Sequence, residues 1–136
     1  MSQIIIRSIL ETALNTITPK IPTQYENIVF TPTTNTPYQS AYLLMNTPDD
    51  IVLASGGMFR EKGLFQVTLR FPLGNGTVTA MTQAEKIRNT FARGTVLEKD
   101  GHRLICDQTP SIRVLPNEVD RFVVAVKVSF MVDIFT

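Results

Sequence analysis

Residues 121–133 alternate apolar and polar side chains almost without interruption, and this pattern limits the possible folds more than any other segment. The apolar members are Phe122, Val124, Val126, Val128, Phe130 and Val132, and the polar members are Arg121, Lys127, Ser129 and Asp133. A period of two residues predicts a β-strand with one buried face. The segment spans about 43 Å at about 3.3 Å per residue, whereas a compact chain of this length is about 37 Å across. The strand must therefore bend, bulge or project.

Two other segments repeat apolar residues at the period of an α-helix, and each is expected to pack one face on the sheet. Residues 2–17 are expected to stop being helical at Thr18-Pro19, because a residue before proline avoids the helical conformation. Residues 78–93 are followed by Gly94, which favours the left-handed conformation of a helix cap. The first stripe comprises Ile6, Ile9, Leu10, Ala13, Leu14 and Ile17, and the second comprises Ala80, Ala84, Ile87 and Phe91.

Shorter patterns predict the remaining strands. They lie at the start of residues 27–37 and at residues 38–45, 51–53, 64–71, 96–99, 103–107 and 112–115. Asp100-Gly101 predicts a tight hairpin between two of these strands. Residues 31–37 and 55–63 are expected to be polar loops. The first contains two prolines, and the second combines Gly56-Gly57 with a cluster of charges.

This order of elements predicts an α+β fold in which two helices pack on one face of a mainly antiparallel β-sheet. Residues 21–25 are interpreted as a connector between the first helix and the sheet. The chain has 136 residues, of which 43% are hydrophobic, so residues 1–136 are expected to form a single domain. Its core is expected to combine both helix stripes with the apolar faces of residues 65–71 and 122–132.

Charge and composition exclude several classes of partner. The 13 lysines and arginines are opposed by 12 acidic residues, so no net field draws the chain to nucleic acid or to an anionic membrane. The apolar runs are too short to cross a bilayer, and residues 1–10 lack the pattern of a signal peptide. A single cysteine cannot form an internal disulfide, which is typical of a reducing compartment. We therefore expect a cytoplasmic protein with no membrane partner.

Few residues are candidates for chemistry. His102 and Cys106 share a predicted strand, but a metal site needs three or four ligands and a cysteine nucleophile needs a base. We therefore interpret His102 as an exposed turn residue and Cys106 as a buried structural thiol. Asp49-Asp50 is interpreted as a solvated turn, because calcium needs a longer run of oxygen ligands. The sequence predicts no catalytic residue, no metal, no cofactor and no enzymatic activity.

A series of short motifs carries a resemblance. In order they are Glu26-Asn27 with Phe30-Thr31-Pro32, Pro37-Tyr38, Leu43-Leu44, Gly63-Leu64-Phe65-Gln66-Val67, Phe71-Pro72 with Gly74 and Gly76, Ala84-Glu85-Lys86-Ile87, and Phe91-Ala92-Arg93-Gly94-Thr95. Their order and spacing resemble the tail terminator, or tail-completion, proteins of long-tailed bacteriophages. The resemblance runs from about residue 4 to the final strand. After Pro110 only the alternating strand aligns.

The resemblance implies a virion protein that forms a ring, commonly a hexamer, at the head-proximal end of the tail tube after assembly in the host cytoplasm. Such a ring would stop tube polymerisation and would contact the tail tube protein and the head-completion protein, while DNA passes through it. We expect subunit contacts at the sheet edges and the two polar loops. The candidate interface residues are Thr31, Thr33, Asn35, Tyr38, Phe59, Arg60, Glu61 and Lys62. Two alternatives stay open: a head–tail connector or other minor tail protein, and a small enzyme with an unrecognised site.

Overall fold

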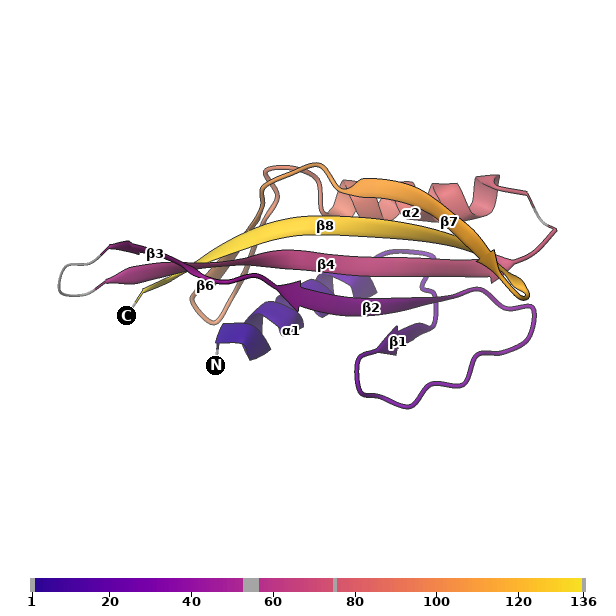
Figure 1. The fold of residues 1–136 in the computed structure, drawn as a ribbon, viewed down its shortest axis with the longest axis horizontal. Coiled ribbons are helices and arrows are strands. Elements are labelled where there is room, and N and C mark those ends of the chain that lie inside the picture. The colour runs from indigo at the N-terminus through magenta and orange to yellow at the C-terminus, as the bar shows by residue number, and fades with distance from the viewer. Residues whose placement is uncertain (1, 53–56, 75, 136) are drawn as a thin grey trace.

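The computed structural model describes residues 2–52, 57–74 and 76–135, which form two helices and eight strands (Figure 1). The elements are α1 (Ser2–Asn15), β1 (Thr23–Tyr25), β2 (Tyr38–Met45), β3 (Asp49–Val52), β4 (Met58–Pro72), α2 (Val78–Thr90), β5 (Val96–Lys99), β6 (His102–Cys106), β7 (Ser111–Glu118) and β8 (Arg121–Phe135). All the described strands belong to one sheet, in the order β1-β2-β4-β8-β6-β5. In addition, β3 pairs with β4, and β7 pairs with β8.

The sheet is mainly antiparallel, as predicted, and only the pairing of β1 with β2 is parallel among the described strands. It is curled rather than flat (Figure 1). The α+β class expected from the sequence is therefore confirmed. The finer expectation, that both helices lie on one face of the sheet, stays a prediction. Neither described helix has the length and apolar character needed to span a membrane.

Strands β4 and β8 form a ladder that runs the length of the molecule (Figure 1). Their register is unbroken from Met58 opposite Phe135 to Pro72 opposite Arg121. Each strand has 15 residues and spans about 50 Å at about 3.3 Å per residue. The long strand predicted at residues 121–133 is confirmed, and it projects. Its last residues, 131–135, join residues 58–62 of β4 and all of β3 in an extension that we call the arm, and β6 still pairs with Met131 and Val132 at the base of this extension.

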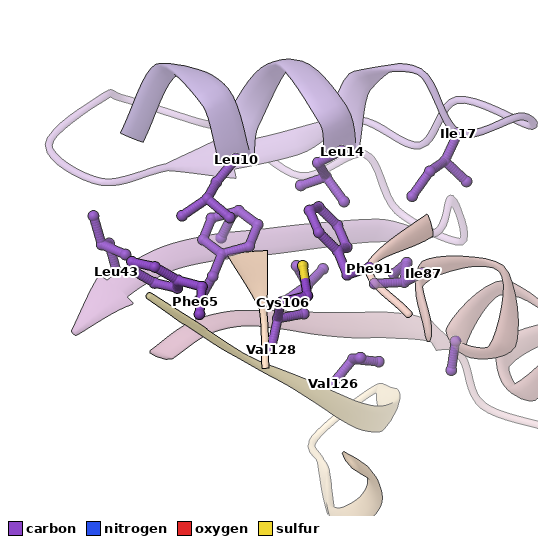
Figure 2. Packing of buried hydrophobic residues seen from close by; sticks show 14 of the residues in the cluster. Leu10, Leu14, Ile17, Leu43, Phe65, Ile87, Phe91, Cys106, Val126 and Val128 are labelled. Carbon is purple, nitrogen blue, oxygen red and sulfur yellow. The ribbon is translucent and has the colours of Figure 1, made fainter. Parts of the chain in front are cut away.

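Side chains from α1, α2 and the sheet meet in one apolar core (Figure 2). Phe65 and Phe91 lie edge to face at its centre, with 6.0 Å between their ring centroids. The predicted core is confirmed, although Ala13 and Phe122 are only partly buried. Its fully buried members include Ile6, Leu10, Val67, Leu69, Ala84, Ile87, Val124, Val126, Val128, Phe130 and Val132. Cys106 is also fully buried in this core, as expected.

Both helices end earlier than their apolar stripes predict. Helix α2 ends at Thr90 instead of residue 93, and the Phe91 amide donates the last helical hydrogen bond to the Ile87 carbonyl. Gly94 has the predicted left-handed conformation, with φ of 88°. Its amide donates to the Cys106 carbonyl at 2.7 Å. Pairing with β6 therefore draws the chain away from the helix axis after Phe91.

The first short strand is not where the sequence predicts it. Residues 27–30 are a loop that begins with Asn27 at φ of 58°. The strand is instead β1, in the segment interpreted as a connector. β-branched residues favour strands only where they can pack, and Val29 is 96% exposed. Parallel pairing of β1 with β2 depends on partners distant in sequence, so the local pattern does not reveal it.

The second predicted loop is also wrong in part. Residues 58–63 belong to β4, and residues 53–56 lie outside the described part of the chain. Asp49-Asp50, interpreted as a turn, begins β3. The predicted tight turn at Asp100-Gly101 is confirmed, with φ of 51° and 78°. His102 follows it as the first residue of β6 and is half-buried rather than exposed.

Candidate assembly surfaces

The predicted interface residues fall into two groups at opposite ends of the β4–β8 ladder. Thr31, Thr33 and Asn35 lie in the loop that leads to Tyr38, the first residue of β2. Tyr38 is opposite Arg70 of β4, whereas the second group begins at Phe59 in the arm. Phe59 and Arg70 are eleven positions apart on β4, which corresponds to about 36 Å. The structure therefore brings each group together but does not join the two groups into one site.

At the first end, Arg121 holds the loop of residues 31–37 against the sheet. This side chain is buried, and its guanidinium donates to the backbone carbonyls of Thr36 and Thr33, the latter at 2.9 Å. The same guanidinium lies 5.0 Å from the centroid of the Tyr38 ring. Carbonyl acceptors and an aromatic face stabilise a buried cation. The loop is consequently fixed in place, and we call residues 31–37 the clamped loop.

A second arginine supports Tyr38 at this end. The Arg70 guanidinium lies 5.6 Å from the Tyr38 ring centroid and donates to the Ser40 hydroxyl at 2.7 Å. It also forms an ion pair with Glu118 of β7 at 2.9 Å. Sequence analysis did not single out Arg70 or Arg121 as functional residues. Both occupy polar positions in strands that were predicted from alternation. No local sequence pattern identifies the distant residues that they contact.

At the other end, the charged side chains on one face of the arm form ion pairs with one another. Arg60 and Asp133 form a two-point ion pair, at 2.7 and 3.2 Å. The Lys62 ammonium donates to the Asp49 carboxylate at 2.7 Å. The hydrogen bond from Arg60 to Asp133 and the attraction between their charges raise the pKa of Arg60 above its ordinary value. Arg60 and Lys62 were predicted to lie in a polar loop, but their charges are paired across strands with Asp133 and Asp49.

Glu61 lies on the opposite face of the arm and is buried, with 5% of its surface exposed. It pairs in register with Val132, which is fully buried. Its Oε2 atom has no hydrogen-bond partner among the described residues. A buried carboxyl oxygen without a donor destabilises the fold. Glu61 is therefore the one predicted interface residue whose placement in the monomer is energetically unfavourable.

The edge of β2 beyond β1 is closed by a side chain. Glu26 Oε1 accepts a hydrogen bond from the Leu43 amide at 2.7 Å and another from Arg7 at 2.9 Å. Burial acts to raise the pKa of Glu26, but these two hydrogen bonds and the Arg7 charge outweigh it and lower the pKa. A carboxylate in this position occupies a backbone donor that another strand would need. Glu26 therefore protects part of the sheet edge.

The residues considered for chemistry do not come together as a reactive site. The His102 imidazole Nδ1 lies 3.1 Å from the Asp100 carbonyl oxygen. Burial, assisted by the Asp107 charge, raises the pKa of the Cys106 thiol to about 11, so the nucleophilic thiolate is scarce at neutral pH. Within residues 2–52, 57–74 and 76–135, no group of three or more His, Cys, Asp and Glu residues could hold a metal ion.

Comparison with known proteins assigns the chain to a family. A family model described as "Phage tail terminator protein" matches residues 5–130. No curated protein matches the chain. Nine chains of solved structures are similar to it. One of them, described only by a sequence identifier, has a TM-score of 0.80 and 23% sequence identity over 100% of this chain and 99% of that chain.

The solved structure supports the fold alone, because its sequence identity to this chain is low. The family match covers nearly the whole chain, and it confirms the resemblance seen in the sequence motifs. Its members are structural proteins without an enzymatic role. The chain belongs to the phage tail terminator protein family and is a structural component of a phage tail.

Proposed function

We propose that this protein forms a ring at the head-proximal end of a phage tail tube, where it stops tube polymerisation and provides the surface to which the head is joined. The ring would contain six copies and would assemble in the host cytoplasm before it becomes part of the virion. Its partners would be the tail tube protein on one side and the head-completion protein on the other. DNA would pass through its channel without a specific contact.

The observation that carries this proposal is the family match over residues 5–130. The β4–β8 ladder supports it, because the ladder separates the clamped loop from the arm, so that one copy carries two different surfaces. Contacts between two different surfaces are heterologous, and they close into rings when the rotation permits. The formal charge of +1 also suits a DNA channel, since a strongly cationic lining would retain the duplex.

The subunit contacts belong to both ends of the molecule in this proposal. At one end, the contacts come from the clamped loop, which Arg121 already orders, and from the adjacent Tyr38 of β2. The loop residues are Thr31, Thr33 and Asn35. At the other end, the contacts come from the arm, which projects from the body (Figure 1). The predicted interface residues of the arm are Phe59, Arg60, Glu61 and Lys62. An ordered loop binds with a smaller loss of conformational entropy than a mobile loop does.

Electron microscopy of particles assembled without this protein tests the proposal. If the protein ends tube growth, its absence should give overlong tails that do not join heads. If it is instead a head–tail connector, tails of normal length should accumulate unjoined. Normal tail lengths would therefore contradict the terminator role and favour the connector role.

A further inference from the structure

The two faces of the arm differ in how their charges are paired. The face that carries Arg60, Lys62 and Asp133 is neutralised by ion pairs within the chain. The other face carries Phe59 together with two acidic residues, Asp50 and Glu61. Asp50 lies opposite Phe59 in the ladder. The Asp50 carboxylate is exposed, and no side chain in the described part of the chain forms an ion pair or hydrogen bond with it.

The spacing of these two acids follows from the register. Glu61 is two positions beyond Phe59 on β4, so Asp50 and Glu61 are diagonal neighbours on one face. Diagonal neighbours across an antiparallel pair lie about 7–8 Å apart. Glu61 lies beneath the surface, and Asp50 is directly accessible. The arm thus presents the Asp50 carboxylate next to the half-buried side chains of Phe59 and Ile134.

A pair of cations lies near the middle of the β4–β8 ladder, away from the arm. Arg113 of β7 is opposite Ala125, and Lys127 is two positions further along β8. These two side chains are therefore diagonal neighbours at the same spacing of about 7–8 Å. Both are exposed, and the described part of the chain contains no ion pair or hydrogen bond to either side chain. They lie on one face of the sheet, and Val126 and Val128 lie on the opposite face.

We infer that the arm of one copy lies across the β7–β8 surface of a second copy, where Asp50 meets Arg113 and Lys127. This inference rests on the proposed ring and names the surface of the neighbouring copy that receives the arm. The opposite charges of Asp50 and of the Arg113–Lys127 pair, all exposed, carry the argument, together with the apolar character of the arm face. Arm-to-arm contact would oppose two acidic faces, and contact between two β7–β8 surfaces would oppose two cationic ones. Like charges in apposition disfavour both symmetric arrangements and leave the head-to-tail arrangement.

Other exposed strand edges lack this complementarity. Strand β1 contains no charged residue, and both charges of β5 have partners within the chain, Glu98 with Arg103 and Lys99 with Ser8. Glu118 of β7 is paired with Arg70. Arg113 is thus the charged side chain of β7 without a partner in the described part of the chain, and Asp50 is the corresponding side chain of β3.

Charge reversal in two separate variants provides the test. Asp50→Lys and Arg113→Glu should each weaken self-association of the full chain by about tenfold or more, measured by sedimentation velocity over a range of concentrations. An equimolar mixture of the two variants should restore association. In alternating order, the introduced lysine faces the introduced glutamate at one contact, and the native Asp50 and Arg113 meet at the next.

Two exposed residues serve as matched controls. Glu85→Lys reverses an exposed acid on α2, and Lys20→Glu reverses an exposed cation outside both surfaces. Neither should change association. Melting temperatures should be unchanged in all the variants, and Asp50→Asn with Arg113→Gln replaces the reversals if either one unfolds the chain. The same variants are then scored for binding to tube ends.

The outcomes separate this inference from the proposed function. Loss in both single variants with recovery on mixing supports the arm contact even if the wild-type protein does not cap tubes. Wild-type capping with silent single variants would overturn the arm contact but leave the terminator role intact. Failure of the mixture to recover, or equal loss in the controls, would also overturn it.

Discussion

Phe91 is the point where helix α2, the following turn and the sheet meet. Its ring is fully buried and lies against Phe65. Replacing Phe91 by alanine should lower the free energy of unfolding by about 3–5 kcal/mol, because it removes apolar contacts and leaves a cavity. Denaturant unfolding measures this change. Val29→Ala is the control, because Val29 is 96% exposed, and it should change the free energy of unfolding little. Equal stability of Phe91→Ala and wild type would show that Phe91 does not belong to the core.

For Glu61 we predict the opposite effect, namely that its replacement raises the free energy of unfolding. Its Oε2 atom is buried without a partner beside Val132. Glu61→Met, which keeps an unbranched side chain of similar length, should raise the free energy of unfolding by about 1–3 kcal/mol. The melting temperature of the isolated chain should rise accordingly. Glu98→Met at an exposed position should not raise it, and a lower melting temperature for Glu61→Met would show that the carboxyl group stabilises the fold.

At the scale of elements, Glu26 links α1 to the edge of β2 and makes this link sensitive to pH. The pKa of Glu26 is lowered in the folded chain, so its contribution is fully present above the ordinary pKa of 4.5. It is lost as the pH falls through the folded pKa, which lies below 4.5. Wild type should therefore be more stable than Glu26→Gln near neutral pH, and this difference should shrink below pH 4.5. A difference that is constant with pH would contradict the role of the carboxylate.

Elements with local signals were predictable from the sequence, and elements with distant partners were not. The alternation in β8 and the Asp100-Gly101 turn are local, and both are confirmed. The start of β4 was not predicted, because Arg60 and Lys62 were interpreted as part of a solvated cluster of charges. Their partners Asp133 and Asp49 become visible only when three strands are aligned.

Gly63 shows the same limitation at the base of the arm. It belongs to one of the family-like motifs, but the motif does not explain why a glycine is needed. A Cβ atom at this position would lie 2.4 Å from the Leu44 carbonyl oxygen. The close approach of β2 to β4 therefore requires a residue without a side chain. Sequence patterns mark the glycine, whereas only the tertiary arrangement supplies its reason.

At the scale of the whole molecule, the β4–β8 ladder places two different surfaces about 36 Å apart. The sequence predicted both groups of interface residues, but it treated them as two flexible loops. In the structure, one group lies in a loop held by Arg121 and the other lies in the projecting arm. A long strand that must bend, bulge or project was expected from its length alone, whereas its direction and its partners follow from the register. In the proposed ring, this geometry would allow one copy to use different surfaces for its neighbours.

Addition of the purified protein to growing tail tubes tests the terminator role most directly. Tube length is followed over time by light scattering, and the position of the protein is determined by electron microscopy with a label. We predict that wild-type protein stops elongation and is found at one end of each tube, and that heat-unfolded protein does neither. Tubes that elongate at the same rate with and without the wild-type protein would contradict the terminator role.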